Sequence, residues 1–104
     1  MPTETDPGFD LSFGDFVIAR SDERLIGPGG PVRLGRKAYQ VLLMLAENDG
    51  RLVTKDALFD SVWEGVIVSE SALTSVIKEL RRALDDQLGQ ARYIESVYGR
   101  GYRF

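Results

Sequence analysis

Apolar residues recur at helical spacing over residues 69–84, and this is the clearest pattern in the chain. Ser69 precedes Glu70, and a capping hydroxyl followed by an acid is typical of the start of a helix. The apolar positions that follow, three and four residues apart, predict one buried face: Leu73, Val76, Ile77, Leu80 and Leu84. The opposite face carries hydroxyl and cationic side chains: Ser71, Thr74, Ser75, Lys78, Arg81 and Arg82. This helix is therefore expected to bury one side and to present the other to solvent or to a ligand.

Two shorter helices are predicted before it. Residues 36–48 place apolar side chains on one face and end at an Asn-Asp-Gly sequence, which is typical of a helix end followed by a turn. After a short extended bridge at residues 51–53, Thr54 is expected to cap a second helix. This helix reaches Trp63 and points Leu58, Val62 and Trp63 inward.

Short β-like runs flank the helices on both sides. Those at residues 11–13, 16–19, 24–26 and 32–34 are separated by turn residues and predict a small antiparallel sheet with a scaffold role. Residues 93–97 and 102–104 predict a β-hairpin whose tip holds Arg100 between Gly99 and Gly101. These glycines would let the tip approach another backbone closely. The fold class expected from these elements is α+β.

Composition excludes most catalytic chemistry. The 104 residues suit a single domain and include neither cysteine nor histidine, so thiolate nucleophiles, the commonest general base and the commonest metal ligands are missing. Residues 27–30 are glycine-rich but lack the lysine of a phosphate-binding loop. We therefore expect no enzyme activity, no cofactor and no metal site. The longest apolar run, residues 41–46, predicts no membrane contact by this segment and a cytoplasmic location.

The net charge of −3 argues against an indiscriminate nucleic-acid binder. The acids are concentrated in residues 1–68, which hold 7 Lys/Arg against 11 Asp/Glu, whereas residues 69–104 hold 6 against 5. Charges farther away than about 8 Å are largely screened at physiological salt. The C-terminal third can therefore present a locally basic surface.

Residues 80–84 and 93–104, with their ending Gly99-Arg100-Gly101-Tyr102-Arg103-Phe104, resemble the C-terminal half of the winged helix-turn-helix domain of OmpR/PhoB-type regulators. Residues 35–46 and 54–63 resemble the first two helices of that family. The short loop at residues 66–70 is most similar to the N-terminal domains of CadC- and ToxR-like one-component regulators. Residues 1–10 are expected to form a flexible tail, because their start has two prolines and no hydrophobic periodicity. The resemblance implies one winged helix domain at 11–104. Its parts are a sheet at 11–34, a three-helix core at 35–85 and a wing hairpin at 92–104.

The resemblance also implies sequence-specific binding of double-stranded DNA by a bacterial transcriptional regulator. The helix 69–84 would enter the major groove, where Ser71, Thr74 and Ser75 permit close approach to the bases and Lys78 reads a base edge. Arg81 and Arg82 would clamp phosphates. The wing at 98–101 would lie at the minor groove, with Arg100 inserted and with Ser96 and Tyr98 on phosphates. Lys55 and the indole of Trp63 are further phosphate candidates, although core packing is an alternative for Trp63.

Other interpretations of the same residues stay open. Cations on the exposed face of any helix are often merely solvated, as Arg100 at a hairpin tip would be. Arg33, Arg36 and Lys37 are expected to be surface charge. Glu79 lies among the proposed DNA-facing residues, where an acid repels phosphate. With the negative net charge, it suits the alternative of a winged helix used as a protein–protein interaction module.

The resemblance extends to partners and location. It implies contact with RNA polymerase and a homodimer on tandem half-sites. It further implies a full-length protein anchored to the inner membrane through a region absent from this segment.

Overall fold

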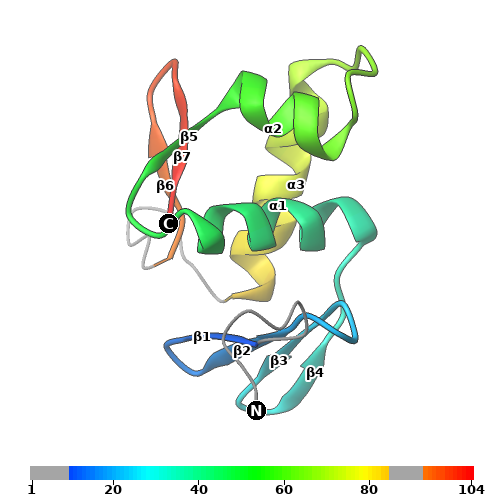
Figure 1. Ribbon diagram of the computed structural model, residues 1–104, viewed down its shortest axis with the longest axis vertical. Helices are drawn as coiled ribbons and strands as arrows, with labels where there is room; N and C mark the ends of the chain where they lie inside the picture. The colour runs from blue at the N-terminus through cyan, green and yellow to red at the C-terminus, as the bar shows by residue number, and fades with distance from the viewer. Residues whose placement is uncertain (1–9, 85–92) are drawn as a thin grey trace, which may run out of the picture.

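The computed structural model describes residues 10–84 and 93–104, which form three helices and seven strands (Figure 1). Residues 1–9 of the expected tail and residues 85–92, which join the expected three-helix core to the wing hairpin, lie outside the described residues. In chain order the elements are β1 (Leu11–Phe13), β2 (Phe16–Ala19), β3 (Arg24–Gly27), β4 (Gly30–Val32), α1 (Arg36–Glu47), β5 (Leu52–Thr54), α2 (Lys55–Val62), α3 (Glu70–Ala83), β6 (Glu95–Val97) and β7 (Gly101–Arg103).

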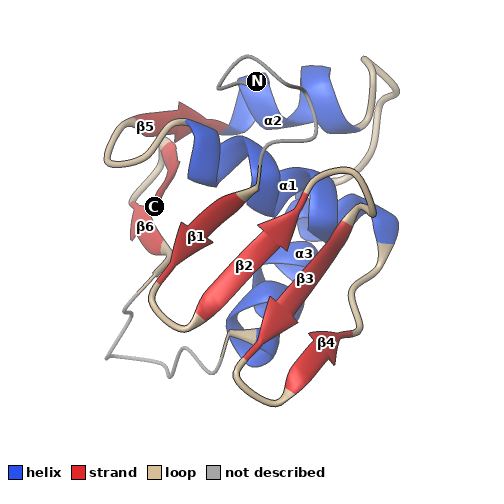
Figure 2. Cartoon of the chain, turned by 60° about the horizontal axis from the view of Figure 1, so that its bottom comes forward, coloured by secondary structure: helices blue, strands red, loops and turns tan. Residues whose placement is uncertain are grey.

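The first four strands form an antiparallel sheet in the order β1-β2-β3-β4, which covers α1 and α3 from one side (Figure 2). One row of residues crosses all four strands as consecutive partners, namely Leu11, Ile18, Leu25 and Val32. Ile18 and Leu25 in this row are fully buried among the apolar side chains of the helices. The pattern of alternating apolar residues therefore identified the inner face of the sheet correctly.

The predicted fourth strand, residues 32–34, was wrong in position. β4 covers Gly30–Val32, because the turn consists of Pro28 and Gly29 alone and Gly30 already pairs with Gly27. Pro31 pairs opposite Ile26 although proline has no backbone N–H to donate. It is tolerated because β4 is the edge strand of the sheet.

The three predicted helices are confirmed, together with their buried faces. α1 ends at Glu47, and the side-chain amide of Asn48 donates to the carbonyl oxygen of Met44 at 2.8 Å, which satisfies one of the last carbonyls of the helix. Thr54 caps α2 as expected, since its hydroxyl accepts from the backbone N–H of Ala57 at 3.1 Å. The apolar stripe of α3 is buried against α1 in the shared core.

The C-terminal hairpin forms a three-stranded sheet, β5-β7-β6, rather than a free two-stranded ribbon. The extended bridge before α2 supplies β5, which pairs with β7. A Cβ atom on Gly101 would lie 2.1 Å from the carbonyl oxygen of Val53, so the glycine is required where β7 meets β5. The expectation that both wing glycines serve the tip is therefore wrong for Gly101. Only Gly99, with a φ of 70°, belongs to the turn.

Candidate nucleic-acid interface

The solvent-facing side of α3 gathers the residues that the sequence pattern assigned to it. Those exposed along this side are Ser71, Thr74, Ser75, Lys78 and Arg82. Two of the hydroxyls also make internal hydrogen bonds. Thr74 donates to the carbonyl oxygen of Glu70 at 3.3 Å, and the Oγ atoms of Ser69 and Ser71 lie 2.7 Å apart.

A groove of about 440 Å³ runs between α3 and the wing. It is lined by side chains of both elements: Thr74, Ile77, Lys78, Arg81, Arg82, Ser96 and Tyr102. Ser96 and Tyr102 are cross-strand partners in β6 and β7, which explains how the hairpin brings both of them to the helix. Three cations from α3 surround a partly apolar surface, an arrangement suited to an anionic chain with flat apolar parts.

Arg81 differs from the other cations of α3, because it is half-buried and bonded to the wing. Its Nη2 donates to the carbonyl oxygen of Ile94 at 3.0 Å and to Oγ of Ser96 at 2.9 Å. The residue predicted as a phosphate clamp thus connects α3 to the first strand of the hairpin. The predicted phosphate contacts of Arg81 and Ser96 stay predictions.

The tip of the wing is tied to the start of α2. The backbone N–H of Arg100 donates to the carbonyl oxygen of Val97 at 2.9 Å, and the N–H of Lys55 donates to the carbonyl oxygen of Arg100 at 3.1 Å. The side chain of Tyr98 is 99% exposed, and that of Arg100 is exposed as well. The wing therefore presents Tyr98 and Arg100 to solvent from a backbone that is held at both ends.

Lys55 forms an ion pair with Glu70, the first residue of α3. The hydrogen bond that Lys55 donates to Glu70 raises the pKa of the Lys55 ammonium above its usual value, and the carboxylate's charge acts in the same direction. This pair joins the N-terminal ends of α2 and α3. The sequence pattern predicts Lys55 as a phosphate contact and Glu70 as an acid at the start of a helix, but not their pairing, because no local pattern connects residues on separate helices.

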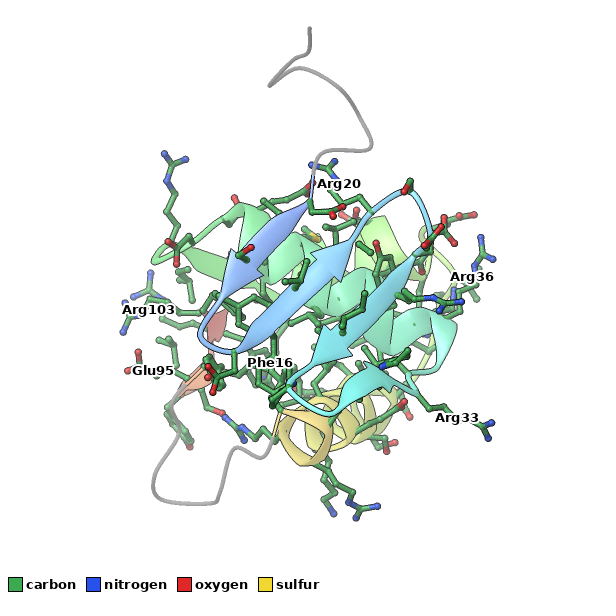
Figure 3. The ribbon with its side chains drawn as sticks, turned by 90° about the horizontal axis from the view of Figure 1, so that it is seen from below. Phe16, Arg20, Arg33, Arg36, Glu95 and Arg103 are labelled. Carbon is green, nitrogen blue, oxygen red and sulfur yellow. The ribbon has the colours of Figure 1, made fainter. Side chains whose placement is uncertain are left out.

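Trp63 is 8% exposed and packs against Phe59, with ring centroids 5.5 Å apart, so the structure places it in the core. Lys37 lies 5.9 Å from the centre of the indole and donates to the carbonyl oxygen of Val62 at 2.9 Å. Lys37 therefore binds the C-terminal end of α2, where a cation is favoured, and is not merely surface charge. Arg33 and Arg36 extend outward, as expected of surface cations (Figure 3).

Glu79 points to α1 and does not line the groove. Its Oε2 accepts from the backbone N–H of Gly35 at 2.8 Å. Gly35 occupies the N-cap position of α1 without a side chain, and the first turn of α1 has no acid. Glu79 thus supplies the anion that the N-terminus of α1 lacks, which corrects the expectation of an acid facing DNA.

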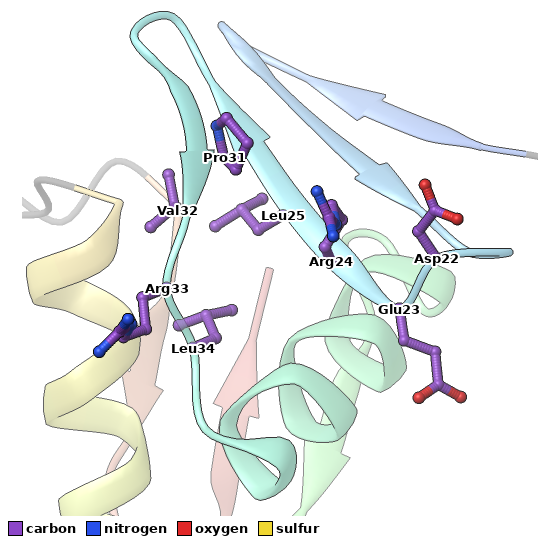
Figure 4. Close-up of a pocket in the computed structure, with 8 residues that line it drawn as sticks. All are labelled: Asp22, Glu23, Arg24, Leu25, Pro31, Val32, Arg33 and Leu34. Atoms are coloured by element: carbon purple, nitrogen blue, oxygen red, sulfur yellow. The ribbon is translucent and has the colours of Figure 1, made fainter.

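A second hollow, of about 420 Å³, lies at β3 and β4 (Figure 4). Both signs of charge line it, from Asp22 and Glu23 to Arg24 and Arg33. It shares no residue with the α3–wing groove. Its mixed charge makes it a poorer match for a polyanion than the groove.

Residues 10–84 and 93–104 contain no group of three or more acids that could hold a metal ion. None of their helices has the length and apolar character needed to cross a membrane.

Comparison with known proteins gives one consistent result. Residues 29–104 match the family described as "Transcriptional regulatory protein, C terminal". The transcriptional regulator HilA of Salmonella typhi is 41% identical over 92 residues, which are 88% of this chain and 16% of HilA. The transcriptional activator CadC of Escherichia coli is 30% identical over 91 residues, 86% of this chain and 18% of CadC. The chain thus spans less than a fifth of either relative.

The fold is also similar to that of a solved protein–DNA complex. In the crystal structure of the Klebsiella pneumoniae RstA DNA-binding domain with the RstA box, the protein superposes with a TM-score of 0.81 at 27% identity. The match covers 91% of this chain and 95% of that domain.

Proposed function

The chain belongs to the family of OmpR/PhoB-type DNA-binding domains of transcriptional regulators, and from this premise we propose that it binds double-stranded DNA sequence-specifically in a bacterial regulator. The family is one of DNA-binding domains and not of enzymes. In the proposed complex α3 lies in the major groove and residues 98–101 lie at the minor groove. The observation that carries this proposal is the groove between α3 and the wing, which three cations of α3 surround.

In the proposed complex some side chains of α3 contact bases and others contact phosphates. The small hydroxyls of Ser71, Thr74 and Ser75 allow the helix to approach base edges, and Lys78 reaches a base acceptor. Arg82, one turn further along and exposed, contacts phosphate. Arg81 retains donors beyond those given to Ile94 and Ser96, and we assign it a phosphate contact at the base of the wing.

The wing and the start of α2 add contacts to the DNA backbone. Arg100 enters the narrow minor groove of an A·T-rich flank, while Tyr98 and Ser96 donate to phosphates. Lys55 contacts phosphate beside the N-terminus of α2, in addition to its pairing with Glu70. For Trp63, its burial against Phe59 favours a packing role over the phosphate contact.

We extend the proposal to partners and location. In the loop between α2 and α3, Val66 is 62% exposed and Ile67 is 98% exposed, which supports contact with a protein, and RNA polymerase is the partner that the family suggests. Binding as a homodimer on tandem half-sites, in the cytoplasm where DNA is accessible, completes the proposal. An inner-membrane anchor would lie outside these 104 residues and stays a prediction.

Selection from a random duplex library at about 100 mM salt tests this function, followed by salt titration of the enriched site. We expect a short repeated half-site and, for about five phosphate contacts, a slope of about −4 to −5 in log affinity against log salt. Arg100→Ala should weaken the preference for A·T-rich flanks.

The alternative is a winged helix that binds protein, which the net charge of −3 and the exposed Val66 and Ile67 favour. It predicts no enriched duplex and no DNA binding even at low salt. A fusion to a dimerisation module identifies a missing dimer contact as the cause, because only in that case does the fusion restore selection.

A further inference from the structure

We propose that Glu70, held by Lys55, is a specificity-determining residue that accepts a hydrogen bond from the exocyclic amino group of a cytosine in the major groove. This inference rests on the proposed function and deepens it, because it names a base and the side chain that selects it. None of the DNA contacts proposed above includes Glu70.

Glu70 lies at the end of α3 where contacts with base edges are expected. It is the first residue of α3, and the N-terminal residues of a recognition helix are those that meet base edges. Its side chain is 60% exposed, on the same helix as Ser71 and Thr74. A carboxylate at this point projects from the end of the helix that enters the groove.

The hydrogen bonds around Glu70 occupy one of its two carboxylate oxygens. Lys55 binds Oε2, and within the described residues Oε1 accepts no hydrogen bond. The hydroxyl of Thr74 donates to the backbone carbonyl of Glu70, and that of Ser71 is engaged with Ser69. Oε1 of Glu70 is therefore a strong acceptor that is free at the N-terminal end of α3.

Charge explains why an acid is tolerated there. An isolated carboxylate would be repelled by the phosphates, but the ammonium of Lys55 neutralises this one and fixes its orientation. Exposed ion pairs contribute little to folding stability, so stability alone is a weak reason for the pair. The Lys55–Glu70 ion pair has a specific role if it orients one carboxylate oxygen of Glu70 toward a base.

The chemistry of the base edges selects cytosine. In the major groove cytosine presents its N4 amino group as a donor, whereas guanine and thymine present acceptors that repel a carboxylate. Adenine also presents an amino group, but its N7 acceptor lies beside it. A lone carboxylate oxygen therefore favours cytosine, and a glutamine at the same place would favour adenine through both groups.

The test measures the affinity of the 104-residue protein for the selected site and for every single-base variant of that site. Glu70→Gln and Glu70→Ala are compared with Glu64→Gln, which removes the same charge from an exposed residue outside α3. We expect the unmodified protein to lose about 10-fold in affinity when one cytosine is replaced. Glu70→Ala should remove discrimination at that position alone, Glu70→Gln should shift the preference there to adenine, and Glu64→Gln should leave the profile unchanged.

Two outcomes overturn the inference, and they are distinguishable. If both Glu70 variants change affinity equally for all sequences, the ion pair only joins α2 to α3, while the proposed function stands. If the unmodified protein selects no duplex at all, the proposed function fails and this inference fails with it. Far-UV circular dichroism of each variant confirms that a lost preference does not reflect unfolding.

Discussion

At the scale of single residues, the cations of α3 are of two kinds. Lys78 and Arg82 are exposed and, within the described residues, make no hydrogen bond or ion pair. Arg81 is half-buried and holds the wing through Ile94 and Ser96. In the proposed complex Lys78 and Arg82 would be available to DNA, whereas Arg81 connects α3 to the wing.

Replacing Lys78 and Arg82 singly should separate base reading from phosphate binding. Lys78→Ala should relax the preference at one base position by about 1–3 kcal/mol, because a base-edge contact is lost. Arg82→Ala should weaken binding to all DNA sequences nearly equally and lower the magnitude of the salt slope by about 1. Competition binding against single-base variants measures both effects. Uniform losses in both variants would refute the base-reading role of Lys78.

Tyr39 is a buried phenol whose hydroxyl has no hydrogen-bond partner among the described residues. Burial raises the pKa of Tyr39, and the charge of Glu23 acts in the same direction. The folded protein therefore retains a proton that the unfolded chain releases near its ordinary pKa of about 10. It follows that stability falls as the pH rises above that value.

Tyr39→Phe should remove this part of the alkaline loss. At pH 7 the free energy of unfolding should stay unchanged or rise by about 1 kcal/mol, because an unpartnered buried hydroxyl is removed. Urea denaturation of both proteins between pH 7 and about pH 11 tests the prediction over the range where tyrosine titrates. A large loss of stability at pH 7 would mean that the hydroxyl is hydrogen-bonded in solution.

At the scale of elements, the wing is attached to β5, to the start of α2 and to α3. β7 pairs with β5, the N–H of Lys55 binds the carbonyl of Arg100, and Arg81 binds the start of β6. A wing held in this way keeps its tip at a fixed distance from α3. In the proposed complex, the contacts to the two DNA grooves would thereby be arranged before DNA binds.

Gly101→Ala should disrupt this attachment. The new methyl group would meet the carbonyl oxygen of Val53 at 2.1 Å, so β5 and β7 must separate. We expect a loss of about 1–3 kcal/mol in stability. The control is Gly29→Ala, since nothing lies within 4 Å of its Cβ position. Equal melting temperatures for the two variants would contradict the close approach.

Glu79→Ala tests the contact between α3 and α1. Loss of the bond to the N–H of Gly35 should destabilise the protein by about 1 kcal/mol, as for other helix N-terminal partners. Glu79→Gln keeps an acceptor and should lose less. Thermal unfolding measures the stability, and the salt slope of DNA binding should not change. A steeper slope in Glu79→Gln would indicate that the acid faces phosphate after all.

At the scale of the whole molecule, an aromatic cluster joins the N-terminal sheet to the base of the wing. Phe13 contacts Tyr93 and Phe104 with ring centroids 5.4 and 4.9 Å apart, and Phe16 lies 5.8 Å from Tyr93. The same core continues through the helices to Trp63. Segments far apart in the chain thus share one apolar interior.

This continuity predicts a single cooperative unfolding transition. The fluorescence of Trp63, at the end of α2, and the far-UV circular dichroism of the whole chain should change at the same urea concentration. Phe13→Leu should shift both signals together. Transitions that separate by more than the experimental error would show that the sheet unfolds independently of the helices.

The helices, their buried faces, the cap at Thr54 and the hairpin with Arg100 at its tip could all be predicted from the order of residues alone. These features depend on neighbours within a few positions, and periodicity reports such neighbours directly. The predicted position of β4 was wrong because the turn is confined to Pro28 and Gly29, so that Gly30 and Pro31 belong to the strand. The family resemblance likewise depends on short runs of neighbouring residues, chiefly 80–84 and 93–104.

Which charged side chains are available to a ligand depends instead on how the elements pack together. Lys55 and Glu70 are 15 residues apart, Arg81 and Ser96 are also 15 apart, and Gly35 and Glu79 are 44 apart. On a single helix Arg81, Arg82 and Glu79 are equivalent polar positions, and their different roles come from the elements packed beside each of them. Periodicity within a helix contains no information about those neighbours, because packing the core brings them together from distant parts of the chain.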